Sequence, residues 1–333
     1  GIAAARLLRA GFGRILVTGP HAAAAEAVFE HAAGLLPQAR RSKGRLRLGD
    51  AELRYLPPDT LARERREARA LLVDEAAALP APLLTRLLER HSRIAFATTV
   101  HGYEGTGRGF DVRFRATLDA RAPEWREIRL ATPIRFAPGD PLERVIFHAL
   151  LLDAAPAPDA VVGDTQATPD ADADADADAD VEVTWPDRDA LAADEHALSQ
   201  AFGLLVLAHY RTRPFDLRFL LDAPDVEVGL AHHAGDVAGV CLVTREGRLE
   251  TELAEAIRRG HRRPRGHLGP EALASQMGCA EGARLASARV LRIAVHPALR
   301  RRGVGTRMLR SLAERAPRAG LDFLSSSFGA TPG

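Results

Sequence analysis

The feature that most constrains the fold is a run of alternating aspartate and alanine, which extends from Asp170 to Asp180. Aspartate disfavours strands, the like charges repel one another, and alanine offers little apolar area to bury. Segment 155–186 is therefore predicted to be an acidic low-complexity linker. A metal-binding repeat is the alternative, but calcium loops need glycine turns and varied oxygen ligands, which this run lacks. The 333 residues allow two domains with separate cores, which we place at 1–154 and 187–333.

Composition narrows the possible partners and compartments. The 45 basic residues balance 44 acidic ones, so the net charge by itself does not indicate a nucleic-acid partner, although arginines cluster in places. The cysteines Cys241 and Cys279 are too far apart in sequence for a metal motif or a disulfide framework, and a reducing cytoplasm is the simplest compartment. No uninterrupted apolar run approaches the ~18 residues of a membrane span. We expect a cytoplasmic protein with no membrane contact and infer no stable protein partner.

The first half contains an acidic pair at the end of a predicted strand. The apolar segment 70–73 is followed by Asp74 and Glu75. In nucleotide hydrolysis an aspartate at such a position holds Mg²⁺, and the glutamate orients or deprotonates the attacking water. The same residues also fit a helix N-cap with an acidic first turn. The local sequence leaves both interpretations open.

Two later segments favour a phosphate site. A predicted strand at 93–99 leads into HGYEGTGRGF, and a glycine-rich loop after a parallel strand is typical of sites that sense a bound phosphate. Arg135, which precedes a predicted helix, is expected to reach a phosphate. However, the sequence contains no G-x-x-x-x-G-K-[ST] motif. The nucleotide site predicted from this half therefore has no phosphate cradle.

The second half contains a strand, an Arg/Gly loop and a helix in succession. We predict a strand at Val290–Val295, a loop at Arg300–Gly305 and a helix that begins at about Thr306. Glycines at 303 and 305 let backbone N–H groups point into one concavity, to which the helix N-terminus adds partial positive charge. The loop is expected to bind a pyrophosphate, with an ordinary basic turn as the alternative. The pattern Arg-x-x-Gly-x-Gly resembles the acetyl-CoA loop of GNAT acetyltransferases.

Six motifs in order extend this resemblance over nearly the whole chain outside 155–185. They are VDEAA, TTVHGYEGTGRGF, PIRFAPGDPLE, LAHYRTRPFDLRFLLDAP, RRPRGHL and RIAVHPALRRRGVG. Together they resemble bacterial tRNA(Met) cytidine acetyltransferases. The resemblance implies an α/β architecture: a P-loop NTPase, helicase-like domain with a parallel sheet, followed by a GNAT α+β domain.

The same resemblance implies a reaction and a longer protein. The implied enzyme uses acetyl-CoA, ATP and Mg²⁺ to acetylate N4 of the wobble cytidine in elongator tRNA(Met). Its phosphate-binding lysine and serine would precede residue 1. The segment 321–333 resembles the strand that diverges from its neighbour to admit the pantetheine arm, and the family's last helix and strands would follow it. We therefore expect the chain to be truncated at both ends.

The resemblance also assigns site residues. Asp74 (with Mg²⁺), Glu75 and Arg135 are assigned to ATP. Four arginines are assigned to tRNA phosphates, with a solvated basic loop as the alternative for the last three: Arg211, Arg262, Arg263 and Arg265. The strand residues assigned to pantetheine and the loop residues assigned to pyrophosphate are Ile293, Ala294, Val295, Arg300, Arg301, Arg302, Gly303, Val304, Gly305 and Thr306.

Catalytic candidates follow from the chemistry of the acceptor. The exocyclic amine of cytosine is a weak nucleophile because its lone pair is delocalised, so a general base or proton relay assists attack on the thioester. His209 and Tyr210 are the first candidates, followed by His267 and His296, although a histidine at a helix end often serves as a cap. Cys241 is available for a covalent acyl relay, whereas the family pattern implies direct transfer.

Two other functions are compatible with the residues. One is a GNAT enzyme that acetylates a protein or a small-molecule amine, with the first domain as a scaffold. The other is an RNA-remodelling NTPase, or an RNA-binding module, whose acetyl-CoA fold does not transfer acetyl groups.

Overall fold

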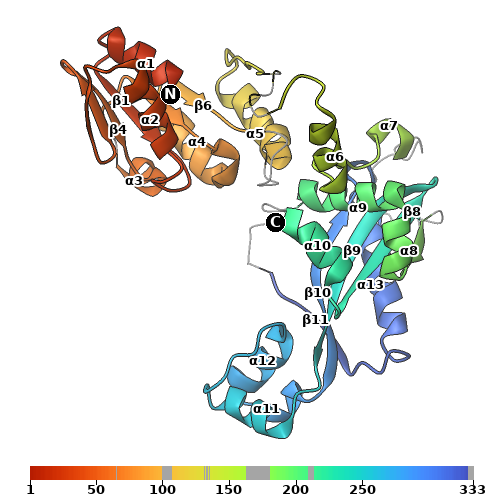
Figure 1. Cartoon of the computed structure of the whole chain (residues 1–333). Helices are drawn as coiled ribbons and strands as arrows, with labels where there is room; N and C mark the ends of the chain where they lie inside the picture. The colour runs from red at the N-terminus through yellow and green to blue at the C-terminus, as the bar shows by residue number, and fades with distance from the viewer. Residues whose placement is uncertain are drawn as a thin grey trace. The chain divides into compact units, whose positions relative to one another are not determined.

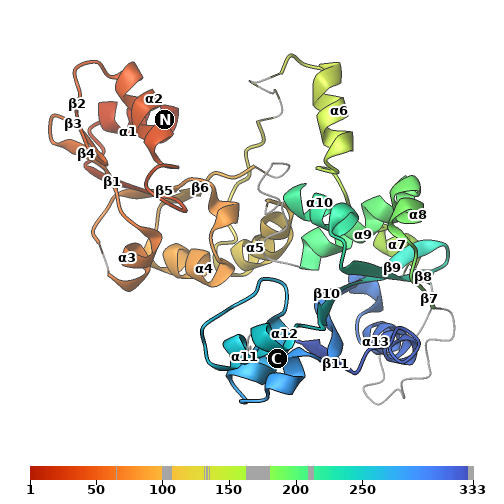
Figure 2. The ribbon, with the colours of Figure 1, turned by 60° about the horizontal axis from the view of Figure 1, so that its bottom comes forward.

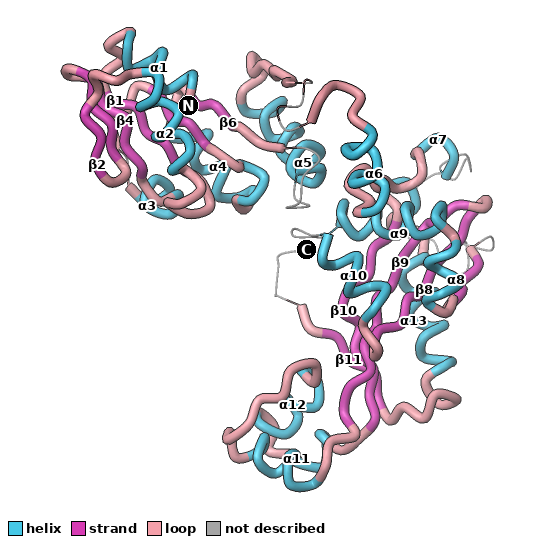
Figure 3. Tube along the Cα trace, viewed as in Figure 1, coloured by secondary structure: helices cyan, strands magenta, loops and turns pink. Residues whose placement is uncertain are grey.

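The structure is a computed structural model that describes residues 1–64, 66–99, 107–130, 132, 134, 136–162, 181–208 and 214–328. These residues divide into two compact units, 1–144 and 145–328 (Figure 1). Each unit has its own sheet, as the strands of Figure 3 show. In the described part of the chain, no helix is both long enough and apolar enough to cross a bilayer.

The first unit contains a six-stranded sheet in the order β2-β3-β4-β1-β5-β6. Strands β4, β1, β5 and β6 are parallel, and β3 pairs antiparallel with both β2 and β4. The strands are β1 (Arg14–Thr18), β2 (Arg40–Ser42), β3 (Arg45–Leu48), β4 (Ala51–Tyr55), β5 (Ala70–Val73) and β6 (Ile94–Phe96). The helices are α1 (Ile2–Arg9), α2 (Glu26–Leu35), α3 (Pro58–Arg63), the 3₁₀ turn η1 (Ala76–Ala78), α4 (Ala81–Arg90), α5 (Gly107–Arg121) and the start of α6 (Pro141–Ala149).

Helices cover both faces of this sheet, as a parallel sheet requires. In β1 the side chains of Ile15 and Val17 pack in one core cluster with α1 and α2, whereas Leu16 packs in the other cluster with α3 and α4. Phe114 of α5 closes the second cluster through an edge-to-face contact with Phe96, with ring centroids 5.0 Å apart.

The second unit contains a five-stranded sheet in the order β11-β10-β9-β8-β7. Neighbouring strands are antiparallel except β10 and β11, which are parallel. The strands are β7 (Glu182–Thr184), β8 (Val226–His233), β9 (Asp236–Gly247), β10 (Ala286–Val295) and β11 (Phe323–Ser326). The helical elements are α7 (Asp159–Val162), α8 (Arg188–Ala193), α9 (Glu195–Ala208), α10 (Pro214–Asp222), α11 (Thr251–Arg258), α12 (Leu268–Ser275), η2 (Ala280–Ala283), η3 (Pro297–Leu299) and α13 (Val304–Arg315).

Successive side chains of β9 point to opposite faces of the sheet and so divide the core of the second unit into two layers. Val240 and Leu242 pack against α9 and α10, and Cys241 and Val243 pack on the opposite face with α13. Figure 2 shows α9 and α13 on opposite sides of the sheet. The helices α11 and α12 lie beyond the ends of β9, β10 and β11 in Figure 1, and they enclose a small core of their own.

The expected fold class is confirmed, and some boundaries differ. The segment 188–208 forms two helices, α8 and α9, and the carboxylate of Asp194 between them accepts a 2.9 Å hydrogen bond from the backbone N–H of Ala197 and so caps the start of α9. Within the predicted linker, Val162 of α7 and Val181, which precedes β7, are buried in the core of the second unit. The Asp–Ala run lies outside the described residues, and the three domain ranges stay a prediction.

Candidate functional site

Strands β10 and β11 form a fork at the edge of the second sheet. Strand β11 pairs with β10 only from Ser287 to Val290, whereas β10 continues to Val295 with β9 as its other neighbour. The register between β9 and β10 shifts at Leu291, where the fork opens. Because every second residue of a strand directs its N–H and C=O away from a given neighbour, 291–295 present backbone groups to the open side. Ile293, Ala294 and Val295, predicted to hold a pantetheine arm, lie on this segment.

A basic loop and a helix N-terminus follow the open segment. Arg300 and Arg301 are exposed, Arg301 has a φ of +64°, and Gly303 at the N-cap of α13 has a φ of +78°. The first amides of a helix have no carbonyl partner within it and carry partial positive charge. Helix α13 begins at Val304, two residues earlier than the sequence predicts. The loop therefore offers backbone donors and guanidinium groups where the strand ends, which suits a pyrophosphate.

A glycine in β9 allows the close approach of α13 to the strands. A Cβ on Gly239 of β9 would lie 2.9 Å from the sulfur of Met308 in α13 and 3.3 Å from the carbonyl oxygen of Ala294. A Cβ on Gly305 would make only ordinary contacts, the nearest at 3.7 Å from Val295. Gly239 is thus required by packing, and Gly305 leaves the first turn open. The packing role of Gly239 was not predicted from the sequence, in which an isolated glycine inside an apolar strand was the available signal.

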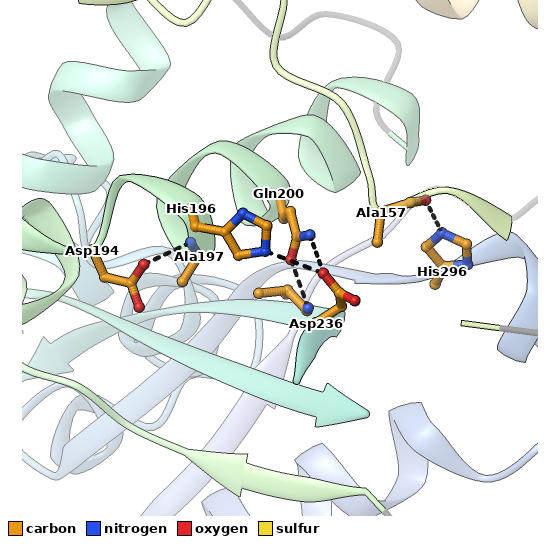
Figure 4. Close-up of polar contacts among 8 residues, drawn as sticks. Ala157, Asp194, His196, Ala197, Gln200, Asp236 and His296 are labelled. Carbon is orange, nitrogen blue, oxygen red and sulfur yellow. Dashed lines mark hydrogen bonds and ion pairs between the residues drawn. The ribbon is translucent and has the colours of Figure 1, made fainter. Parts of the chain in front are cut away.

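His296 is buried and both of its ring nitrogens contact backbone atoms. Its Nε2 lies 2.8 Å from the carbonyl oxygen of Ala157 (Figure 4), and its Nδ1 accepts a hydrogen bond from the N–H of Ala298 at 3.3 Å. The ring is 1 % exposed. This arrangement favours a structural role over the catalytic alternative: His296 fixes the end of β10 to the segment before α7.

A second polar network fixes the β8–β9 hairpin to α9. Asp236 accepts hydrogen bonds from Gln200 and His196, and the Gln200 carbonyl accepts one from the N–H of Val237 at 2.8 Å (Figure 4). The hydrogen bond from Gln200 lowers the pKa of the Asp236 carboxyl. The carboxylate therefore stays charged and holds the hairpin at the strand end that leads to the loop.

Cys241 is unsuited to the acyl relay considered from the sequence. Its side chain is buried beneath α13, and burial raises the pKa of its thiol to about 12. A thiol needs its thiolate form to attack a thioester. The structure thus favours direct transfer.

The catalytic candidates His209 and Tyr210, and also Arg211, lie outside the described residues. Their flanking helices are described: Leu205 of α9 and Leu217 and Leu220 of α10 share one core cluster with Ala294 of β10. Asp216 of α10 also lies 3.4 Å from the guanidinium of Arg292, a contact that was not predicted from the sequence. Both helices that bracket segment 209–213 are therefore fixed against the strand that borders the fork.

The remaining histidine candidate, His267, is at the N-cap of α12. Its Nδ1 accepts a hydrogen bond from the N–H of Gly247 at 3.0 Å. It therefore contacts the far end of β9, next to the paired end of β10 and β11.

In the first unit, Asp74 and Glu75 follow β5 at the carboxyl edge of the parallel sheet. The N–H of Asp74 donates to the Thr18 carbonyl at 2.8 Å, and the next element is a single 3₁₀ turn rather than an α-helix with an acidic first turn. This placement favours the strand-edge interpretation over the helix cap. Glu75 has a φ of +47°, a left-handed conformation that costs about 1–3 kcal/mol in a residue other than glycine.

Two other groups lie at this edge. Thr98, after β6, accepts a hydrogen bond from the N–H of Ala77 at 3.3 Å. A Cβ on Gly19 would lie 3.2 Å from the Asp74 carbonyl oxygen. Arg135 lies outside the described residues, and the described part holds no cluster of three or more His, Cys, Asp or Glu suited to a metal.

Comparisons with known proteins agree with both halves of this geometry. Residues 1–153 match the family described as RNA cytidine acetyltransferase NAT10/TcmA, helicase domain, and residues 200–319 match GNAT acetyltransferase 2. The chain therefore belongs to a class of proteins in which a helicase-type domain is followed by a GNAT acetyltransferase domain.

Named relatives match almost the entire chain. The tRNA(Met) cytidine acetyltransferase TmcA of Nitrosococcus halophilus is 52 % identical over 331 residues, 99 % of this chain and 43 % of that protein. The TmcA of Vibrio cholerae is 39 % identical over 99 % of this chain and 44 % of its own, and that of Haloferax volcanii is 43 % identical over 96 % and 41 %. The chain belongs to the RNA cytidine acetyltransferase family and spans less than half the length of these relatives.

Gly303→Glu is expected to weaken coenzyme A binding by at least about tenfold in the full-length enzyme, because it places a negative charge where the helix N-terminus stabilises phosphate by about 1–2 kcal/mol. Gly278→Glu is the matched control, since Gly278 has a similar φ of +72° and open space around it. Calorimetric titration with coenzyme A measures both variants. Equal affinities for the two would show that this loop does not hold the pyrophosphate.

Proposed function

We propose that the full-length protein uses acetyl-CoA to acetylate N4 of the wobble cytidine of elongator tRNA(Met), in a reaction that depends on ATP and Mg²⁺. The observation that carries this proposal is the fork between β10 and β11 followed by the basic loop at the start of α13. A slot lined by strand backbone and closed by a helix N-terminus suits an amide-bearing arm joined to a pyrophosphate. The tRNA substrate is supported by the relatives named tRNA(Met) cytidine acetyltransferase.

In this proposal, the residues that act on the acceptor belong to segment 209–213. The helices before and after this segment pack against β10, so it connects two elements fixed beside the fork. His209 or Tyr210 would accept the proton of the amine as it attacks the thioester, and the leaving thiolate would be protonated from solvent or the same relay. The cytidine must be unstacked to reach the slot, at a cost of a few kcal/mol.

The first unit would supply energy for that remodelling. Asp74 is assigned to Mg²⁺, Glu75 to the attacking water and Arg135 to a phosphate of ATP. The position of the acidic pair at the carboxyl edge of the parallel strands supports this assignment, because ligands of open α/β sheets bind beyond the carboxyl ends of the strands.

The arginines assigned to tRNA differ in their surroundings. Arg263 donates to the Glu271 carboxylate at 2.6 Å. Arg262 and Arg265 are exposed, and within the described chain neither has an ion pair. We infer that Arg262 and Arg265 contribute more to RNA binding, because their charges are not already compensated.

Nucleoside mass analysis tests the proposed reaction. Full-length protein incubated with acetyl-CoA, ATP, Mg²⁺ and tRNA is expected to give N4-acetylcytidine in elongator tRNA(Met) and none when the wobble cytidine is replaced. Binding of tRNA and ATP hydrolysis without acetylated cytidine would instead support the RNA-remodelling NTPase. Acetylation of a protein or small amine without RNA dependence would support the other alternative.

The double variant Arg262→Ala/Arg265→Ala is expected to reduce the slope of log affinity for tRNA against log salt by about 1.5, the value for two lost phosphate contacts. The matched control is Arg258→Ala/Arg259→Ala, which removes two arginines that both pair with Glu255. Filter binding over a range of salt concentrations measures both slopes. Equal slopes for the two double variants would contradict a specific role for Arg262 and Arg265.

A further inference from the structure

Residues 248–285, between β9 and β10, form a helical insertion that contains α11, α12 and η2. The insertion has its own small core, formed by Ala254, Ile257, Ala274 and Ala283. It also carries the arginine loop 261–266, which leads directly into α12. Its attachment to the sheet therefore determines where that loop lies relative to the strands.

A buried carboxylate makes this attachment. Glu246 is the second-last residue of β9, and its side chain is 0 % exposed. One carboxylate oxygen accepts a hydrogen bond from Nε of Arg289 in β10 at 2.6 Å, and the other accepts one from the N–H of Gly269 in α12 at 2.8 Å. A buried charge is tolerated only when it is paired and hydrogen-bonded, so these two contacts hold Glu246, β10 and α12 as a unit.

The backbone around Glu246 is fixed as well. Its carbonyl oxygen accepts a hydrogen bond from the Ser287 hydroxyl, and the N–H of the next residue, Gly247, donates to His267. Gly247 has a φ of +88°, and a Cβ there would lie 1.8 Å from the Leu285 carbonyl oxygen. This end of β9 therefore has little freedom to move.

The same cluster lies at the paired end of the fork. Arg289 is opposite Ser325 of β11, one residue before the last pair of the two strands. The Ser325 hydroxyl is buried and has no hydrogen-bond partner in the described structure. A Cβ on Gly269 would lie 2.9 Å from that hydroxyl oxygen and 3.3 Å from the Glu246 carboxylate. The first turn of α12 thus packs directly on β11.

We propose that Glu246, Arg289 and Gly269 form a clamp that fixes β11 and α12 at the paired end of the fork, and thereby sets the width of the slot for coenzyme A. These are positioning residues, because they act through β10 and β11. The clamp also fixes the arginine loop relative to the slot. The inference rests on the proposed function in one respect, that coenzyme A binds in the fork.

The test changes the fit between α12 and β11 without removing a charge. In the full-length enzyme, Gly269→Ala is expected to weaken coenzyme A binding about tenfold, because the added methyl group displaces β11 through Ser325. Ser325→Ala alone should bind like the wild type, since it removes only an unpartnered hydroxyl. The double variant should return to within about threefold of the wild type, because the smaller residue restores the space.

Calorimetry with coenzyme A gives the affinities, and ATP hydrolysis reports on the first unit. A role limited to stability would lower the melting temperature of Gly269→Ala while leaving the affinity of the folded protein unchanged, and that result would overturn the proposal. A double variant no tighter than Gly269→Ala would also overturn it. If Gly269→Ala does not fold, the comparison of Arg289→Lys with Arg289→Met tests the clamp. The Arg289→Lys variant should retain its affinity for coenzyme A, and the Arg289→Met variant should lose it. Equal affinities of the two variants would overturn the proposal.

Failure of the clamp is distinguishable from failure of the proposed function. A wild-type enzyme that does not bind coenzyme A contradicts the proposed function. A wild-type enzyme that binds it, with variants that all bind equally well, contradicts only the clamp. Glu227→Gln is the control for breaking an Arg–Glu pair elsewhere in the same sheet, because Glu227 of β8 pairs with Arg245 and Arg315, away from the fork. Its affinity for coenzyme A should equal that of the wild type.

Discussion

The candidate site in the second unit depends on the point of the sheet where β10 loses β11 as its strand partner. Beyond Val290, β10 keeps β9 on one side and, among the described residues, does not pair with β11 on the other. Backbone N–H and C=O groups on that side need partners from water or from a ligand. A ligand with amides along an extended arm satisfies them as an added strand would. The helix N-terminus at the end of the same strand then fixes where the phosphates of that ligand lie.

Strand β10 has an open edge along 291–295, and polar contacts fix the strand on either side of this segment. At the far end His296 binds the backbone of Ala157, and at the near end the Arg289 guanidinium pairs with the buried Glu246 carboxylate. Between them Gly239 lets α13 approach the strand closely. The strand can therefore keep an unpaired edge without collapsing onto β11, which is the condition for a preformed slot.

Local sequence patterns predicted much of this arrangement and missed what depends on long-range contacts. The strand that precedes Asp74 and the glycine at 303 were identified because apolar runs and Arg/Gly turns are local signals. The clamp of Glu246, Arg289 and Gly269 was not, because residues far apart in sequence meet only when the insertion folds onto the sheet. His296 looked like a catalytic candidate for the same reason, since its partner Ala157 lies beyond the Asp–Ala run.

The central claim is that coenzyme A occupies the open side of β10 and the first turn of α13. Amide hydrogen exchange of the full-length enzyme, with and without coenzyme A, tests it most directly. The account predicts that the ligand slows exchange in the peptides that contain Ile293–Val295 and Val304–Thr306, and leaves β1 unchanged. Protection confined to other segments, or no protection at saturating coenzyme A, would contradict the account.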